Sequence, residues 1–264
     1  RGKGIDPLLQ NIGRFAFWPE LKSVLPEGAD DKAVVGAIVG QGLGYGSKPK
    51  GLVTFHAYPD GARKAVEEHL VEAAAYAAAD GVARIHFTVS PEHRAGFEAL
   101  LAEKVPAYAK RFGIRYDISF SVQKPSTDTI AVNPDNTPFR QDDGRLLFRP
   151  AGHGALIENL NEIDADLIFI KNIDNVTTDA LRADTVRFKK VLAGVLLGLQ
   201  ERAFAYLEAL DAGTADSEEV AAFVREELCV KLPERYDAAL LRSILDRPIR
   251  VCGMVRNEGE PGGG

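Results

Sequence analysis

Cysteine is scarce in this sequence, with Cys229 and Cys252 the two among 264 residues. So few cysteines, without a paired metal-binding spacing, exclude a disulfide framework and a cysteine-based metal site. We expect both side chains to be small buried apolar groups in a reducing, cytoplasmic compartment.

Long apolar runs and an excess of positive charge are also missing. The longest helical apolar stretch, 191–199, is about half of the ~20 residues that cross a bilayer, so we expect no membrane span. The 32 Lys and Arg against 38 Asp and Glu give a net charge of −6. This field repels polyanions, which argues against nucleic acid or an anionic membrane as a partner, while a local basic pocket for phosphates stays compatible with it.

The remaining composition, 45% hydrophobic and 27% charged, is typical of a globular protein with one large core. We expect a single α/β domain over residues 1–264. The chain begins at Arg1 without methionine and stops in three glycines, so we expect it to be incomplete at one or both ends. Residues 1–30 predict a helical lead-in, and residues 177–247 predict a helical segment packed on the sheet. The sequence does not predict the oligomeric state.

Strands and helices alternate through the middle of the chain, which favours a mostly parallel sheet covered by helices. The alanine-rich stretch 63–80 predicts the strongest helix, with Glu67 and Glu68 as solvent-facing charges, and Ser90-Pro91 predicts the start of another. The expected strands are 85–89, 115–122, 146–149, 165–170 and 249–255. The 165–170 run is apolar without alternation, so we expect a central strand covered on both faces.

Two segments outside these elements carry weaker patterns. Residues 34–39, after Asp30, fit either a capped helix or a strand. Residues 133–144 are rich in Asn, Asp and Pro, so we expect a turn-dominated excursion there.

A glycine-dense segment, 40–46, is followed closely by Lys48 and Lys50. Alternate glycines such as Gly42 and Gly44 let backbone N–H groups approach an anion, and a lysine beyond them neutralises phosphate charge. The pattern therefore predicts a triphosphate site. The alternative is a flexible surface loop whose lysines are solvated.

His153 lies between Gly152 and Gly154, after one predicted strand and before a predicted helix at 155–160. The glycines permit a close backbone approach, and the helix N-terminus favours negative charge. This pattern predicts that His153 faces a ligand. The alternative is a histidine with a structural role alone.

Asp174 follows the apolar run that ends at residue 170. Open α/β sheets bind ligands at the carboxyl ends of their strands, and a carboxylate there suits Mg²⁺ that bridges phosphates. The alternative is that Asp174 caps a helix starting near residue 177. The last segment, 257–264, sets two acids among glycines, a pattern that fits contacts to sugar hydroxyls or a frayed terminus.

The order of these motifs carries a resemblance to known families. KPKGL (48–52), Gln123, GRLL (144–147), PAGHGAL (150–156) and NIDN (172–175) together resemble the UDP-sugar pyrophosphorylases, a group of nucleotidyltransferases. The segments GYGSKPKGLVTFH, FRPAGHGALIENLN, IKNIDN and NEGEPGGG resemble more closely a bacterial family of the Bacteroidota type, known as domain of unknown function 4301.

The resemblance to pyrophosphorylases implies a three-layer α/β/α sandwich with a mixed, largely parallel sheet, as in nucleotide-diphospho-sugar transferases. It makes Lys50 the catalytic lysine near the phosphates and Asp174 the Mg²⁺ ligand. The residues assigned to the nucleotide, by the resemblance or by the patterns above, are Gly42, Gly44, Lys48, Gln123, Gly152, His153 and Gly154. The residues that fall where sugar contacts are expected are Asn172, Glu260 and Gly262.

The implied activity is a magnesium-dependent transfer of a uridylyl-type nucleotidyl group from a nucleoside triphosphate to a sugar phosphate, with release of pyrophosphate. Such enzymes carry a basic residue in their glycine loop, where this sequence has Tyr45. That difference favours an alternative, a protein that binds a nucleotide or sugar nucleotide without turnover. A glycosyltransferase of the same fold is a third possibility.

Overall fold

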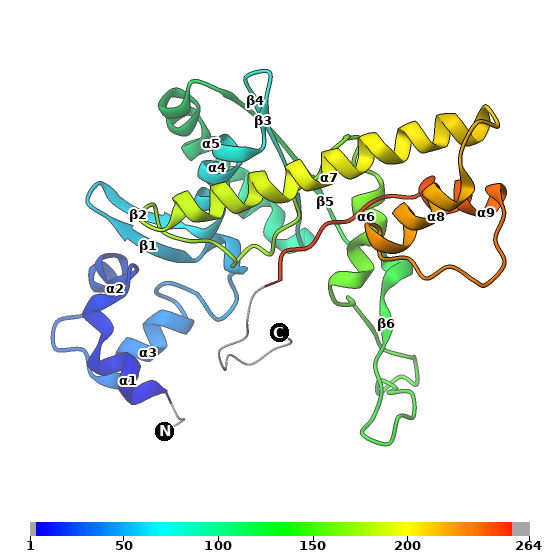
Figure 1. The fold of residues 1–264 in the computed structure, drawn as a ribbon. Helices are drawn as coiled ribbons and strands as arrows, with labels where there is room; N and C mark the ends of the chain where they lie inside the picture. The colour runs from blue at the N-terminus through cyan, green and yellow to red at the C-terminus, as the bar shows by residue number, and fades with distance from the viewer. Residues whose placement is uncertain (1–3, 255–264) are drawn as a thin grey trace. The chain divides into compact units, whose positions relative to one another are not determined.

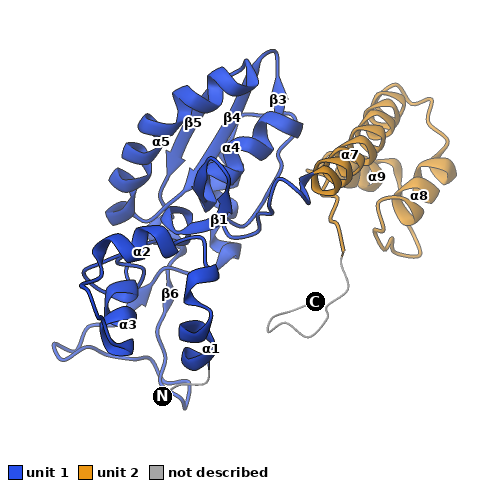
Figure 2. Ribbon diagram, turned by 90° about the vertical axis from the view of Figure 1, so that its left-hand side faces the viewer, with its two compact units in different colours: residues 1–182 blue, residues 183–264 orange. Residues whose placement is uncertain are grey.

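A computed structural model describes residues 4–254 and divides the chain into two compact units, residues 1–182 and 183–264 (Figure 2). The first unit combines helices with strands, and the described part of the second is helical, so the protein is mixed α/β as predicted. Each unit is described by itself. The expectations that residues 1–264 form one domain and that 177–247 pack on the sheet therefore stay predictions. Among residues 4–254, no helix combines the length and apolar character that a bilayer span requires.

The chain opens with a group of short helices, drawn in blue in Figure 1. They are α1 (Ile5–Gln10), η1 (Ile12–Arg14), α2 (Trp18–Val24) and α3 (Asp31–Val39), and their buried core is Leu21, Ile38 and Leu43. The Asp30 carboxylate accepts a hydrogen bond from the Ala33 N–H at 2.8 Å, and this cap favours a helix over a strand. Helices α1, η1 and α2 lie within the predicted lead-in, and the alternative left open for residues 34–39 is resolved as a helix.

The core of the first unit is a βαβ arrangement preceded by a hairpin and a helix. After η2 (Lys50–Leu52), the elements are β1 (Thr54–Tyr58), β2 (Gly61–Lys64), α4 (Ala65–Tyr76), β3 (Ala78–Ala79), β4 (Val82–Thr88), α5 (Pro91–Phe112) and β5 (Arg115–Ser121). The sheet order is β3-β4-β5, with β4 and β5 parallel and in register from Val82↔Arg115 to Thr88↔Ser121. The predicted strands and helices of this region are therefore confirmed, with α4 shorter than 63–80.

One face of the β4–β5 pair is apolar and packs on α4 and α5. Alternate residues such as Ala83 and Phe87 are buried, and they share a core with Leu70 of α4 and Phe97 of α5. The α5 helix begins at Pro91, as predicted, and ends at Gly113, whose φ of 66° is left-handed and therefore favours glycine.

The rest of the first unit is mostly turns. Its elements are η3 (Pro125–Thr127), β6 (Thr129–Ile130), β7 (Phe148–Arg149), η4 (His153–Leu156) and α6 (Ile157–Asn161). The antiparallel β6–β7 pair and the bridge Val132↔Pro138 flank a turn-dominated excursion, which confirms that prediction.

The predicted central strand at 165–170 is wrong, because none of these described residues belongs to a strand. Their apolar side chains pack individually instead: the Phe169 ring lies 4.9 Å from the Tyr76 ring, and Ile170 is exposed. The predicted strand at 249–255 is also wrong over its described part, 249–254. There, Ile249 packs against the helices of the second unit, so its apolar character serves helix packing.

The helix α7 (Arg182–Asp211) begins at the last residue of the first unit and continues into the second, which also contains α8 (Ser217–Glu226) and α9 (Ala238–Leu245). These three helices lie within the segment 177–247, for which the sequence predicts helices. Asp216 and Asp237 cap α8 and α9 through backbone N–H groups, and Val220 and Leu241 are buried between these helices.

The prediction of buried cysteines is wrong, because both Cys229 and Cys252 are exposed. Cys229 follows α8 in a left-handed conformation with φ of 55°, and Cys252 belongs to the irregular segment after α9. Neither position lies on a helix face or strand that turns its side chain into a core.

Candidate functional site

Lys50 and Asp174 form an ion pair between two segments that are far apart in the sequence. Gly51 makes their approach possible, because a Cβ atom there would lie 2.5 Å from the Phe97 ring and 3.1 Å from Cγ1 of Ile173. The first distance is too short for a Cβ atom and the second is tight, so glycine lets η2 pack closely on Phe97 and on the residue that precedes Asp174. The structure therefore brings together the predicted catalytic lysine and the predicted metal ligand.

The pair remains accessible to a ligand. The Lys50 side chain is 67% exposed and the Asp174 side chain 36%. The hydrogen bond from Lys50 holds the pKa of the Asp174 carboxyl below its ordinary value, and the nearby His153 side chain lowers that pKa further. Lys50, His153 and Asp174 thus share one electrostatic neighbourhood, in which the carboxylate stays ionised at neutral pH.

Hydrogen bonds connect the end of β5 and the loop after it to helix α6. Asn159 of α6 donates from Nδ2 to Ser121 Oγ and to the Val122 carbonyl, at 2.9 Å each. Gln123 lies in this loop, and its amide donates to Asp128 Oδ1 at 3.2 Å. This bond uses one of the two N–H donors of the amide, and the predicted contact of Gln123 with a nucleotide base stays a prediction.

The glycine-dense segment folds back on α3. The N–H groups of Leu43, Tyr45 and Gly46 donate to carbonyls of α3, at 2.7 to 3.1 Å. A Cβ at Gly42 would lie 2.5 Å from the Ala37 carbonyl oxygen, so close packing on α3 explains this glycine without a ligand.

Two further predicted nucleotide contacts lie in the same segment. Gly44 has a φ of 67°, and Lys48 Nζ lies 5.8 Å from the centre of the Tyr45 ring. The nucleotide-binding roles of Gly42, Gly44 and Lys48 stay predictions.

The remaining predicted residues are spread over exposed loops and the C-terminal segment. Gly152, Gly154 and Asn172 are exposed, and the Asn172 carbonyl accepts the Asn175 N–H at 3.1 Å, which closes the turn that contains Asp174. Glu260 and Gly262 lie outside the described residues. The alternative that Asp174 caps a helix near residue 177 is wrong, because the next helix, α7, begins at Arg182.

The prediction that Glu67 and Glu68 face solvent is wrong. Glu67 is 4% exposed, Glu68 0% and Glu72, one turn further along α4, 1%. Glu68 receives hydrogen bonds from Tyr58 at 2.6 Å and from Arg182 at 2.5 Å. One sequence signal for this burial is the spacing of Glu68 and Glu72, which puts both on one face of a helix rich in alanine and other apolar residues.

The protonation of Glu68 follows from its partners. Burial raises the pKa of its carboxyl, but hydrogen bonds from Tyr58, His56 and Arg182 outweigh burial and lower the pKa below its ordinary value. Glu68 is thus a buried carboxylate at neutral pH, surrounded by donors.

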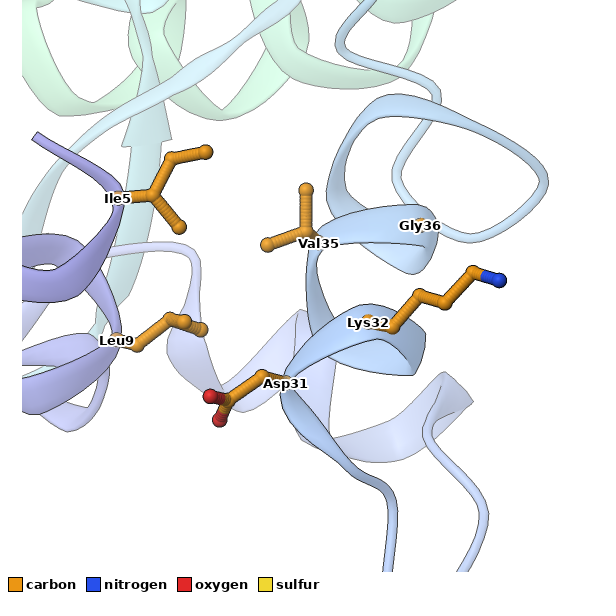
Figure 3. A pocket seen from close by; sticks show the side chains of 6 residues that line it. All are labelled: Ile5, Leu9, Asp31, Lys32, Val35 and Gly36. Atoms are coloured by element: carbon orange, nitrogen blue, oxygen red, sulfur yellow. The ribbon is translucent and has the colours of Figure 1, made fainter. Parts of the chain in front are cut away.

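An apolar hollow lies between α1 and α3, apart from the Lys50–Asp174 pair (Figure 3). The residues that line it are Ile5, Leu9, Asp31, Lys32, Val35 and Gly36. None of them is among the predicted site residues.

The prediction of a metal at this site depends on one carboxylate, that of Asp174. Within residues 4–254, no group of three or more His, Cys, Asp or Glu side chains is arranged to hold a metal ion. Asp174 alone suits Mg²⁺, which commonly takes one or two carboxylates and completes its coordination with phosphates and water. One carboxylate is the fewest that Mg²⁺ takes from a protein in such sites, and magnesium binding at Asp174 stays a prediction.

Fold and site together define a mixed α/β protein with an exposed lysine–carboxylate pair beside a parallel βαβ arrangement. The chain belongs to the family described as "Domain of unknown function (DUF4301)", whose model matches residues 3–264. No curated protein and no solved structure gives a match to the chain.

Proposed function

We propose that this protein is a nucleotidyltransferase that moves a uridylyl-type group from a nucleoside triphosphate to a sugar phosphate. The observation that carries the proposal is the pairing of Lys50 with Asp174, because this pair offers a cation and a carboxylate to one ligand, and His153 is near enough to lower the pKa of Asp174. The parallel β4–β5 pair under α4 and α5 supplies two of the layers of the three-layer sandwich that we propose, and the helical layer on the other face of the sheet is part of the proposal alone.

In the proposed reaction, a phosphate oxygen of the sugar phosphate attacks the α-phosphorus in line. A new P–O bond forms as the bond between the α-phosphorus and the bridging oxygen breaks, and pyrophosphate leaves with that electron pair. Bound Mg²⁺ would supply charge neutralisation for the phosphates, held by Asp174. Lys50 neutralises the remaining charge, and by analogy with other fixed donors its removal costs about 3 kcal/mol, or a hundredfold in rate.

The test is release of pyrophosphate by the full chain, with Mg²⁺, over a panel of nucleoside triphosphates and sugar phosphates. The expected result is release with at least one pair, lowered about a hundredfold by Lys50→Met. Lys110→Met, at an exposed lysine of α5, is the matched control and keeps the wild-type rate. Absence of release with every pair would overturn the proposal.

A second candidate is a protein that binds a nucleotide without turnover. The observation that favours it is the use of the Leu43, Tyr45 and Gly46 N–H groups by α3, which leaves fewer backbone donors for a triphosphate. Under this alternative, UTP raises the melting temperature of wild-type protein and of Lys50→Met alike, and no pyrophosphate is released.

A further inference from the structure

The turn that contains Asp174 is held by two polar groups of α4, the buried Glu72 and the half-buried His69. Lys171 Nζ contacts Glu72 Oε2 at 2.5 Å, and the two side chains are 9% and 1% exposed. His69 Nε2 lies 3.0 Å from the carbonyl oxygen of Ile173, the residue directly before Asp174. Because His69 and Glu72 are three residues apart on α4, they lie on the same face of the helix and hold two points of one turn.

The contact from His69 has a defined direction. A carbonyl oxygen only accepts, so Nε2 carries the hydrogen and donates it. Burial lowers the pKa of the His69 imidazole, which favours the neutral ring with its proton on Nε2. The side chain of Ile173 is fixed as well, because it packs in the core next to Gly51.

The Lys171–Glu72 pair is out of reach of a ligand. Glu72 also accepts from Tyr76 OH at 2.8 Å, and its Oε1 atom is buried without a described partner. A buried charge that loses its partner is costly, so this pair resists opening. Of the two lysines near Asp174, Lys50 is exposed and Lys171 is enclosed, which leaves Lys50 as the one that meets a ligand.

We propose that His69 and the Glu72–Lys171 pair are positioning residues, which hold the Asp174 carboxylate where it meets Lys50 and the metal-bound phosphates. This inference takes its ligand from the proposed function. It adds to the proposed site three residues that do not contact that ligand. Loss of either contact frees the 171–175 turn and weakens binding at Asp174, while Lys50 itself is unchanged.

The experiment compares His69→Leu, which removes the donor, with His69→Gln, whose amide replaces it. Magnesium pyrophosphate is the probe, titrated calorimetrically against the full chain, because it carries the shared chemistry of all nucleoside triphosphates. Supporting groups of metal ligands are worth about 10- to 100-fold in affinity, so we expect at least a tenfold loss in His69→Leu and recovery in His69→Gln.

Tyr116→Phe is the matched control. It removes another hydrogen bond to a carbonyl, from Tyr116 OH to Leu70 of α4 at 2.8 Å, on the side of the helix that faces the sheet core. We expect a lower melting temperature and unchanged affinity for magnesium pyrophosphate. Equal affinity losses in Tyr116→Phe and His69→Leu would overturn the positioning role, because general destabilisation then accounts for both.

A double variant keeps the test decisive if His69→Leu does not fold. Glu72→Gln combined with Lys171→Met removes both buried charges and leaves neither unpaired. We expect this variant to fold and to bind magnesium pyrophosphate at least about tenfold more weakly than wild type. Binding equal to wild type in the folded variant would overturn the proposal.

Hydrogen exchange at residues 171–176 separates this inference from the proposed function. We expect faster exchange there in His69→Leu and in the double variant, but not in Tyr116→Phe, with no ligand present. Faster exchange in a protein whose wild type binds no magnesium pyrophosphate would contradict the proposed function alone. Unchanged exchange in both variants would overturn the positioning role whatever the ligand.

Discussion

Removal of the Asp174 charge should have opposite effects on ligand binding with and without magnesium. In the structure, the Asp174 carboxylate offsets part of the positive charge of Lys50, so it weakens the attraction of Lys50 for a phosphate that arrives without metal. Asp174→Asn frees Lys50 for an anion and at the same time removes the ligand for Mg²⁺. We therefore expect tighter binding of pyrophosphate in EDTA and weaker binding in magnesium.

The size of the first effect follows from exposure. With side chains 67% and 36% exposed, the pair is largely screened by water. Such pairs are worth about 0.5–1 kcal/mol, so the variant should bind metal-free pyrophosphate about two- to fivefold more tightly. In magnesium, loss of a direct ligand should weaken binding by at least about tenfold.

Calorimetric titration of the full chain with pyrophosphate, in EDTA and in excess magnesium, measures both effects. Asp166→Asn is the control, because it removes one exposed carboxylate from the preceding segment and should leave both affinities near wild type. If Asp174→Asn changed the affinity for pyrophosphate in the same direction in EDTA and in magnesium, the reasoning would be refuted. The Asp174 carboxylate would then not both pair with Lys50 and bind the metal.

Three further predictions concern the surroundings of this pair. Glu68→Gln removes the fully buried carboxylate that pairs with Arg182, while Asp179 still pairs with this arginine and with Arg63, so the free energy of unfolding in urea should fall by about 1–3 kcal/mol. Gly51→Ala forces a Cβ into Phe97 and should cost about 1–3 kcal/mol in the same assay. The hydrogen bond from Arg63 lowers the pKa of the Asp179 carboxyl in the folded protein. The ionised Asp179 therefore stabilises the folded state fully above the ordinary pKa of about 3.9, and this stabilisation is lost as the pH falls through the lowered pKa. Asp179→Asn should therefore flatten the fall in unfolding free energy below about pH 4, and an unchanged slope would contradict this pairing.

The central βαβ arrangement could be predicted because its signals are local. Ser90-Pro91 starts α5, Gly113 ends it, and short β runs flank it. The strand predicted at 165–170 failed for the opposite reason. An apolar run is compatible with a strand or with side chains that pack one by one, and the choice depends on distant partners such as Tyr76.

The residues of the candidate site also differ in whether local signals or distant partners determine their positions. That Lys50 and Asp174 lie together agrees with motifs that can be recognised in their own neighbours, while the roles assigned to them stay predictions. The buried carboxylates of α4 could not be predicted, since a glutamate among alanines is usually exposed. Its burial depends on cations such as Lys171 and Arg182, which the fold brings from about a hundred residues away along the chain.

Direct titration of wild-type protein and of the Lys50→Met, Asp174→Asn double variant with magnesium UTP tests most directly whether the two residues form one ligand site. Saturable binding to the wild type, lost in the double variant while its melting temperature stays near wild type, is the expected result. Equal binding by both proteins, or no binding by the wild type to magnesium UTP or any other magnesium nucleoside triphosphate, would contradict the account.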